Sequence, residues 1–214
     1  MRRVLLDDHL EAEFQKEGFV HIPFLKEGEV KFLWDKFYEV LKTSQGHLSP
    51  KDAGLDMDCE ITYDFTFIDR NPQHKKQVLE IIDGVFKPHY EKILDHYKPI
   101  IANYIRKESE TGEVPMHQNW AFADERKCNT VSIWVPLVDS HRGNGALEVV
   151  PKSHKRFGEL RGPMIPWELE GIKEEIIEND LVTCGIKAGE AIILDDSIVH
   201  YSHPNTTKDL RIAI

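Results

Sequence analysis

Apolar side chains in the first part of the chain recur at spacings of three and four residues, which is the period of an α-helix. One set predicts a helix around residues 30–41. A second predicts a helix over residues 78–97 that Pro88 should kink or restart. A shorter helix is expected over residues 8–17, stopped by Gly18 and followed by a short strand over residues 19–23. The apolar positions of the longer helices are Val30, Leu33, Trp34, Phe37 and Leu41, and then Val78, Ile81, Ile82, Val85, Tyr90, Ile93, Leu94 and Tyr97.

After Pro99 the pattern changes to short β-branched and aromatic segments separated by turn residues, which is typical of strands. The tripeptide Gly143-Asn144-Gly145 is a tight-turn signal between two of them. Many short strands in one chain predict a sandwich or barrel, and a jelly roll is the natural candidate. The predicted strands are residues 100–106, 116–122, 130–138, 146–150, 191–194, 198–201 and 210–214.

We therefore expect a single domain over residues 1–214 that is mainly β with flanking helices. Its helical layer should cover about residues 1–99, and its jelly-roll half about residues 100–214. A long connection over residues 156–183, with a helical turn near residues 172–179, is expected to close over the site. Its candidates for contact with substrate, or for packing against the barrel, are Met164, Ile165 and Trp167.

Charge and composition narrow the choice of partners. The 214 residues include 27 Lys and Arg against 37 Asp and Glu, a formal net charge of −10 that would repel nucleic acid and anionic membranes. No apolar run approaches the ~18 residues that a membrane span needs, so we expect a cytoplasmic protein with no nucleic-acid or membrane partner. The three cysteines, Cys59, Cys128 and Cys184, form no CxxC pair, so a zinc knuckle is not expected.

Two of the eleven histidines, His117 and His200, stand in predicted strands of the second half. Because residues i and i+2 of a strand point to the same side, His117 and Asn119 can address one metal ion, with another ligand from a distant strand. Two histidines and one carboxylate form the metal site of non-haem iron(II) oxygenases. Each histidine taken alone is more commonly a core or rim residue, and position 119 here is an amide rather than a carboxylate.

An ordered series of short motifs surrounds these histidines. The motifs are Asn103 followed by Lys107, Pro115-Met116-His117-Gln118-Asn119-Trp120, Ser132-Ile133-Trp134-Val135-Pro136-Leu137, Asn144-Gly145-Ala146-Leu147-Glu148-Val149-Val150-Pro151-Lys152-Ser153-His154, Ala188-Gly189-Glu190, His200-Tyr201-Ser202, and Pro204-Asn205 leading to Arg211. The series resembles the phytanoyl-CoA dioxygenase family of iron(II)- and 2-oxoglutarate-dependent oxygenases over roughly residues 8–214. The resemblance implies a double-stranded β-helix, a cupin-like jelly roll with helices packed on one side.

The resemblance also implies a role for individual residues. His117 and His200 match the two iron-binding histidines, with position 119 as the third ligand and no catalytic residue beyond the metal ligands. Arg211 and Ser202 match the arginine and the hydroxyl that hold the distal carboxylate of 2-oxoglutarate, since a guanidinium can bind a carboxylate through two parallel hydrogen bonds. The positions that match the lining of the cosubstrate pocket are Asn103 and Trp134, with core packing as an equal alternative for Trp134.

Some positions depart from the family pattern. Asn119 is neutral and offers one carbonyl oxygen, so it should bind a divalent ion less tightly than aspartate would. Lys152 stands where the family usually has glycine, and His154 is interpreted as structural. The chain also ends at Ile214, earlier than the family's last strand, which suggests a shortened chain.

We therefore expect a dioxygenase that uses iron(II), 2-oxoglutarate and O2 to hydroxylate an unactivated C–H bond of a small molecule. The alternative is a metal- or ligand-binding jelly roll without turnover, which Asn119 keeps open. Halogenation is less favoured, because asparagine is larger than the small residue of related halogenases at this position. The sequence leaves the substrate and the oligomeric state open.

Overall fold

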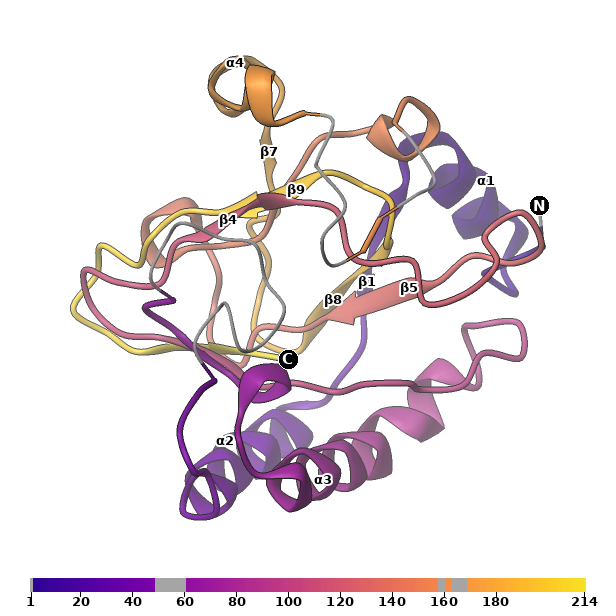
Figure 1. The fold of residues 1–214 in the computed structure, drawn as a ribbon. Coiled ribbons are helices and arrows are strands. Elements are labelled where there is room, and N and C mark those ends of the chain that lie inside the picture. Colours follow the sequence, from indigo (N-terminus) through magenta and orange to yellow (C-terminus); the bar gives the residue numbers. More distant parts are fainter. Residues whose placement is uncertain (1, 49–60, 158–160, 163–168) are drawn as a thin grey trace.

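The structure is a computed structural model that describes residues 2–48, 61–157, 161–162 and 169–214. Three of its four α-helices precede residue 91, and most of its strands follow (Figure 1). The helices are α1 (Asp8–Glu17), α2 (Glu27–Leu41), α3 (Pro72–Tyr90) and α4 (Lys173–Asn179), with 3₁₀ turns at Thr66–Ile68, Arg142–Asn144, Ser153–Lys155 and Glu170–Ile172. The strands are β1 (Phe19–Pro23), β2 (Asp64–Phe65), β3 (Ile105–Lys107), β4 (Val114–His117), β5 (Val131–Trp134), β6 (Glu148–Val149), β7 (Val182–Thr183), β8 (Glu190–Asp195), β9 (His200–Ser202) and β10 (Arg211–Ala213).

The strands form two layers. One layer contains the ladders β1-β8-β5 and β10-β3-β2, and the other is the sheet β4-β9-β6-β7. The two ladders of the first layer are joined because the chain beyond β5 pairs with the C-terminal strand. The N–H of Val135 donates to the carbonyl of Ile214 at 2.8 Å, and that of Leu137 to Ile212 at 2.9 Å. Two facing antiparallel layers with helices α2 and α3 on one side (Figure 1) confirm the predicted jelly roll with flanking helices.

Local signals fix the ends of α1. Oδ1 of Asp7 accepts hydrogen bonds from the N–H groups of His9 and Leu10, both at 2.9 Å, and so satisfies two donors that a helix start leaves unpaired. Gly18 ends the helix in the left-handed conformation, at φ 89°, and its N–H donates to the carbonyl of Phe14. The predicted helix and the strand after it are confirmed residue for residue.

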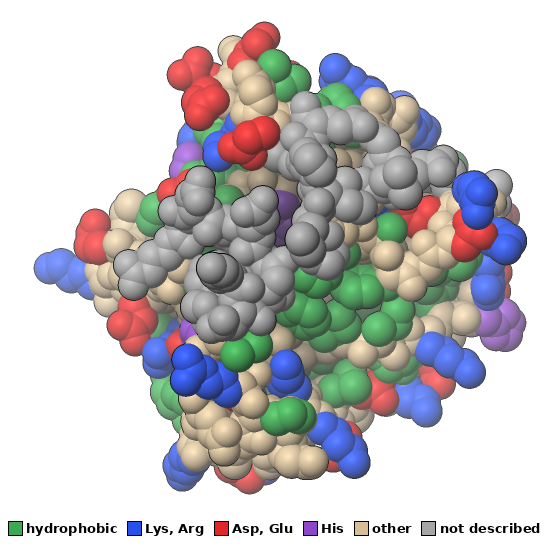
Figure 2. Space-filling model, viewed as in Figure 1, with side chains coloured by type: hydrophobic (Ala, Val, Ile, Leu, Met, Phe, Trp, Pro, Cys, Tyr) green, Lys and Arg blue, Asp and Glu red, His purple; other side chains and the backbone are tan. Residues whose placement is uncertain are grey.

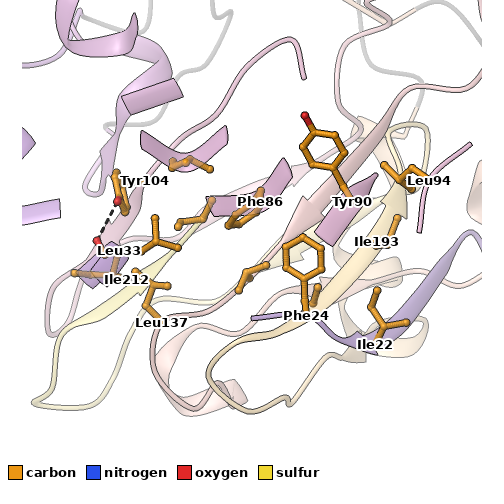
Figure 3. Close-up of a cluster of buried hydrophobic side chains, with 14 of the residues drawn as sticks. Ile22, Phe24, Leu33, Phe86, Tyr90, Leu94, Tyr104, Leu137, Ile193 and Ile212 are labelled. Atoms are coloured by element: carbon orange, nitrogen blue, oxygen red, sulfur yellow. Dashed lines mark hydrogen bonds between the residues drawn. The ribbon is translucent and has the colours of Figure 1, made fainter. Parts of the chain in front are cut away.

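The main apolar core lies between the helices and the larger layer of strands. Successive residues of β8 point to opposite faces, so Ile193 joins the cluster under the helices while Ile192 and Leu194 point between the two layers. Figure 3 shows the first cluster, in which the hydroxyl of Tyr104 donates to the carbonyl of Leu33 at 2.9 Å. The second cluster fixes the separation of the two layers, and therefore the position of the residues that face each other across it.

The predicted helix beyond Pro88 is wrong in its second part. Helix α3 passes through Pro88 but ends at Tyr90. The carbonyl of Ile93 instead accepts from the N–H of Leu6 at 2.8 Å, and Leu94 forms an isolated bridge with Leu5. The apolar residues after Pro88 are therefore covered by an extended N-terminal segment, which the local pattern does not reveal.

Most predicted strands are real but shorter than expected, because a strand ends where its partner ends. The segment predicted over residues 116–122 is strand only to His117, and that over residues 130–138 only to Trp134. Strands β2 and β7 were not predicted, since two residues are too few to show an alternating pattern. The predicted contacts of Met164, Ile165 and Trp167 lie outside the described residues, as does Cys59.

The acidic excess is not gathered into one patch on the face shown in Figure 2. Acidic and basic side chains alternate around its rim, and hydrophobic side chains gather nearer its centre. Within the described ranges, no helix is both long enough and apolar enough to cross a membrane.

Candidate metal and cosubstrate site

The two histidines singled out in the sequence stand opposite each other on adjacent strands. The register of β4 and β9 pairs His117 with His200, and their ring centroids are 4.1 Å apart (Figure 1 shows the two strands side by side). His200 is buried and His117 is half-buried. The fold therefore brings together two imidazoles that are 83 positions apart in the chain.

Both imidazoles are held by a hydrogen bond at Nδ1, so that Nε2 of each ring remains available as a metal ligand. Nδ1 of His117 lies 2.7 Å from the carbonyl of Pro115, and Nδ1 of His200 lies 2.9 Å from that of Ile198. Because a carbonyl only accepts, each Nδ1 carries the hydrogen and each Nε2 keeps a lone pair. Metal-binding histidines are oriented in this way, with the non-ligating N–H donated to a backbone carbonyl.

The pKa values of the pair favour the neutral, ligating form. Burial lowers the pKa of His200 to about 3, with a further contribution from the neighbouring His117. Burial also lowers the pKa of His117, against the opposing effects of its hydrogen bond to Pro115 and of the neighbouring Asn119 amide. A neutral imidazole is the form that binds a metal ion.

Asn119 lies beyond the end of β4, yet its side chain reaches the same place. Nδ2 of Asn119 donates to Asp196 Oδ1 at 2.9 Å and to Ser132 Oγ at 3.2 Å. The side chain also lies beside His117, and with both Nδ2 contacts taken the atom left for the imidazole side is Oδ1. Two imidazole nitrogens and one amide oxygen are therefore grouped, a donor set that fits a divalent transition metal. In the part of the chain that the structure describes, no three His, Cys, Asp or Glu residues are grouped to hold a metal.

A buried arginine lies further along the same interior. Arg211 is 2% exposed, and its Nη2 donates to the carbonyl of Gly145 at 2.8 Å. Its Nε and Nη1 have no hydrogen-bond partner among the described residues, and burial lowers its pKa to about 9. Ser202 donates to the same carbonyl at 2.8 Å. A guanidinium with two buried donors that have no described partner, next to a hydroxyl, is suited to bind a carboxylate at the far end of a dicarboxylic acid.

Lys107 is a second buried basic side chain at this point, and its role was not predicted although the residue belongs to the matched motifs. It is fully buried, and its Nζ lies within hydrogen-bond distance of Ser202 Oγ at 2.5 Å and of the carbonyls of Ser202 and His203 at 3.2 and 2.7 Å. Burial, with a further contribution from the charge of Arg211, lowers its pKa to about 6. The sequence signal that could have indicated this role was the position of a lysine directly after the predicted strand over residues 100–106.

The structure brings the predicted residues together in two groups and leaves Trp134 and Asn103 apart from both. The first group is His117, Asn119 and His200. The second is Ser202 and Arg211, to which the structure adds Lys107. Trp134 packs between the two layers, in the apolar cluster that also contains Ala213. Asn103 lies two residues before β3, and its buried Oδ1 has no partner among the described residues. The contact of Asn103 and Trp134 with a cosubstrate stays a prediction.

The sequence matches a known family over nearly its whole length. The family model described as phytanoyl-CoA dioxygenase matches residues 14–213. A phytanoyl-CoA dioxygenase domain-containing protein 1 homolog from Dictyostelium discoideum is 35% identical in a 120-residue alignment that covers 51% of this chain and 42% of that protein. The chain therefore matches less than half the length of this curated relative.

Solved structures share the fold at lower identity. The carbocyclase SnoK from nogalamycin biosynthesis, described as non-heme and alpha-ketoglutarate-dependent, superposes with a TM-score of 0.66 at 22% identity, covering 97% of this chain and 81% of that one. HygX from Streptomyces hygroscopicus, solved with nickel and 2-oxoglutarate bound, superposes with a TM-score of 0.62 at 15% identity, covering 97% and 85%. At these identities the likeness concerns the fold.

Proposed function

The chain belongs to the phytanoyl-CoA dioxygenase family, and on that premise we propose that it is an oxygenase that uses iron(II), 2-oxoglutarate and O2 to hydroxylate a C–H bond of a small molecule. The proposal keeps the single domain over residues 1–214 and the cytoplasmic location expected from the sequence. Relatives of this fold carry out other reactions with the same cosubstrate, and SnoK is described as a carbocyclase. Hydroxylation is therefore the finer part of the proposal.

One observation carries the proposal. The histidine pair and Arg211, a buried arginine with two donors that have no partner among the described residues, lie in the same interior between the strand layers. His200 and Ser202 are two residues apart on β9, so they point to the same side at a separation of ~6.6 Å along the strand. A cosubstrate that reached from the histidines to Ser202 and Arg211 would have to carry an anionic group at the far end. 2-Oxoglutarate has this shape, with a chelating keto acid at one end and a carboxylate at the other.

The site residues would have two separate roles, metal binding and binding of the cosubstrate carboxylate. His117, His200 and Asn119 would hold the metal, while Arg211 and Ser202 would bind and orient the distal carboxylate. Iron(II) with 2-oxoglutarate and O2 supplies the oxidising chemistry when bound, as is usual for cofactor-based oxidation. Burial of the site would keep water away from the reacting atoms.

A second candidate function is metal or ligand binding without turnover. The amide of Asn119 favours it, because a neutral ligand leaves the site one negative charge short of the usual donor set. Halogenation ranks last, since the Asn119 side chain stands where a halide would have to bind.

The test is an anaerobic titration of the purified protein with iron(II) and 2-oxoglutarate. We expect one iron per chain and the weak visible absorption of an iron–2-oxoglutarate chelate. His117→Ala and His200→Ala should each abolish stoichiometric iron binding, whereas His96→Ala, on a side chain that is 90% exposed, should bind as the parent does. Equal iron binding by both site variants and the parent would remove the histidine pair from the proposal.

Arg211→Met tests the cosubstrate half of the site. The loss of a charge-assisted contact of about 1.5–3 kcal/mol should weaken 2-oxoglutarate binding by one to two orders of magnitude. Calorimetry with the parent and the variant measures this, and unchanged affinity would contradict the assignment. Exposure of the loaded protein to O2 then separates the two candidate functions, since an oxygenase releases succinate and a binding protein does not.

A further inference from the structure

The turn between β8 and β9 holds two consecutive buried carboxylates, each 5% exposed, that face different partners. Asp195 accepts from the N–H of Ser197 at 2.8 Å and from its hydroxyl at 2.5 Å, so it closes the turn on itself. Asp196 accepts instead from Asn119 Nδ2 at 2.9 Å and from Ser132 Oγ at 2.6 Å. Only Asp196 is therefore in contact with the residue at the third ligand position.

This contact decides which end of the Asn119 amide faces the histidines. An asparagine has a donor end and an acceptor end of nearly the same shape, and only the oxygen can bind a cation. The carboxylate of Asp196 and the hydroxyl oxygen of Ser132 both accept from Nδ2. The amide is held by its nitrogen, and the oxygen is left toward His117.

The backbone on either side of the amide is held as well. Nε of Arg161 donates to the carbonyl of Asn119 at 2.8 Å, and Nε2 of Gln118 donates to the carbonyl of Ser197 at 2.5 Å. The segment after β4 is thus fastened to the same turn that carries Asp196. With the backbone held, the rotation of the amide is set by the hydrogen bonds of Nδ2 to Asp196 and Ser132, and Ser132 itself donates to Asp196.

We infer that Asp196 is a positioning residue for the metal site, which holds Asn119 with its amide oxygen turned toward His117 and His200. The inference rests on the proposed function, since it assigns a role toward the metal ion. It explains how a site of this kind can keep an oxygen ligand when position 119 is an amide. The carboxylate that the site lacks at position 119 lies one hydrogen bond behind it, and neutral donors from Asn119, Ser132 and Thr130 hold it there.

The same geometry changes the expectation for a carboxylate at position 119. From the sequence alone, Asn119→Asp should tighten metal binding. In the structure it would place two carboxylates at the 2.9 Å separation of the present hydrogen bond, where like charges cannot both ionise freely. The double variant Asn119→Asp/Asp196→Asn reverses donor and acceptor and restores the pair.

The experiment measures Co(II) binding to the metal-free protein by calorimetry and by the visible absorption of the bound ion, with 2-oxoglutarate absent and present. Asp196→Ala should weaken Co(II) binding by about 10–100-fold, as expected when the partner of a metal ligand is lost, whereas Asp196→Asn would keep an acceptor oxygen. Asp195→Ala is the matched control, because it makes the same change in an equally buried neighbour that does not contact Asn119. The double variant should regain at least the parent's affinity, and melting temperatures of all variants report whether the fold is kept.

The outcomes separate this inference from the proposed function. Selective loss in Asp196→Ala with recovery in the double variant supports the inference. If the parent binds Co(II) and Asp196→Ala binds it equally, or if Asp196→Ala and Asp195→Ala lose affinity alike without recovery in the double variant, the positioning role is overturned while the proposed function stands. A parent that binds no Co(II) overturns both.

Discussion

At the scale of single residues, the most unusual feature is a pair of basic side chains buried without a carboxylate in contact. Among the described residues, Arg211 and Lys107 donate only to neutral oxygens, those of Gly145, Ser202 and His203. Gly145 makes the close approach possible, since its φ is 74° and an added Cβ would lie 2.8 Å from Lys107 Nζ. Buried charges without a counter-charge are costly, and such perturbed groups mark functional sites.

Lys107 gives a prediction about protons. With its pKa lowered to about 6, Lys107 is mostly neutral at pH 7.5 in the unliganded protein. A carboxylate bound nearby favours the charged form, so binding of 2-oxoglutarate should take up close to one proton at pH 7.5 and almost none at pH 5. Calorimetry in buffers of different ionisation enthalpy measures this uptake. Lys107→Met should abolish it and Lys31→Met, on the exposed face of α2, should not; equal uptake in both variants would contradict the assignment.

At the scale of elements, β9 places the site by its alternation. His200 and Ser202 point inward, and Tyr201 between them packs on the opposite side with Met116 and Val199. A shift of β9 by one residue would therefore remove both site groups at once. The 3₁₀ turn at Ser153–Lys155 supports this region, because His154 packs its ring against Gly18 at the end of α1. Lys152 has a φ of 68°, a left-handed conformation that glycine would adopt without strain.

The end of α1 gives a stability prediction with a built-in control. Gly18→Ala should lower the free energy of unfolding by at least ~1–2 kcal/mol, since φ is 89° and an added Cβ would lie 2.4 Å from His154 Nδ1. Gly84→Ala, in an exposed position of α3 with no atom within 4 Å of an added Cβ, should raise it by ~0.5–1 kcal/mol. Urea denaturation measures both, and His154→Ala combined with Gly18→Ala should recover the part due to the contact. A Gly18→Ala protein as stable as the parent would contradict the packing described here.

At the scale of the whole molecule, the site joins the two layers of strands. The histidines come from the sheet β4-β9-β6-β7, while Arg211 and Lys107 face each other in the ladder β10-β3 of the other layer. Arg211 and Ser202 both donate to the carbonyl of Gly145. Gly145 lies in the segment that connects β5 of one layer to β6 of the other. A ligand that bridges the two groups should therefore stabilise the fold as a unit.

The corresponding prediction needs no metal. A dicarboxylate that binds the folded chain at 100 times its dissociation constant adds about 2.7 kcal/mol to the free energy of unfolding, or about 5–10 °C in melting temperature at this size. In the presence of a chelator, 2-oxoglutarate should raise the melting temperature of the parent but not of Arg211→Met, and acetate should raise neither. An equal shift by 2-oxoglutarate in Arg211→Met would place the anion elsewhere.

The unliganded protein should become more stable between pH 6 and 10.5, because over this range the unfolded chain binds a proton at Lys107 that the folded chain does not.

The sequence by itself determined the elements whose signals are local, and its ordered motifs predicted the site residues. The cap at Asp7 and the glycine at Gly18 set α1, and the periodicity of β-branched residues placed most strands. His117, His200, Ser202 and Arg211 were predicted because their ordered motifs resemble those of the family, and their roles in the site stay a prediction. These signals need no knowledge of what lies across the core.

Only the tertiary structure decided features that depend on partners distant in the chain. The apolar residues after Pro88 are covered by the N-terminal segment rather than wound into a helix. Strand ends are set by neighbouring strands, so β4 stops at His117, and Asn119 reaches the histidines through its hydrogen bonds rather than through strand alternation. Asp196 and Lys107 acquire their roles only when the turn after β8 meets the segment after β4, and when β3 pairs with β10. The physical reason is the same in each case: a hydrogen bond or a buried charge is defined by both of its partners, and the local sequence contains only one of them.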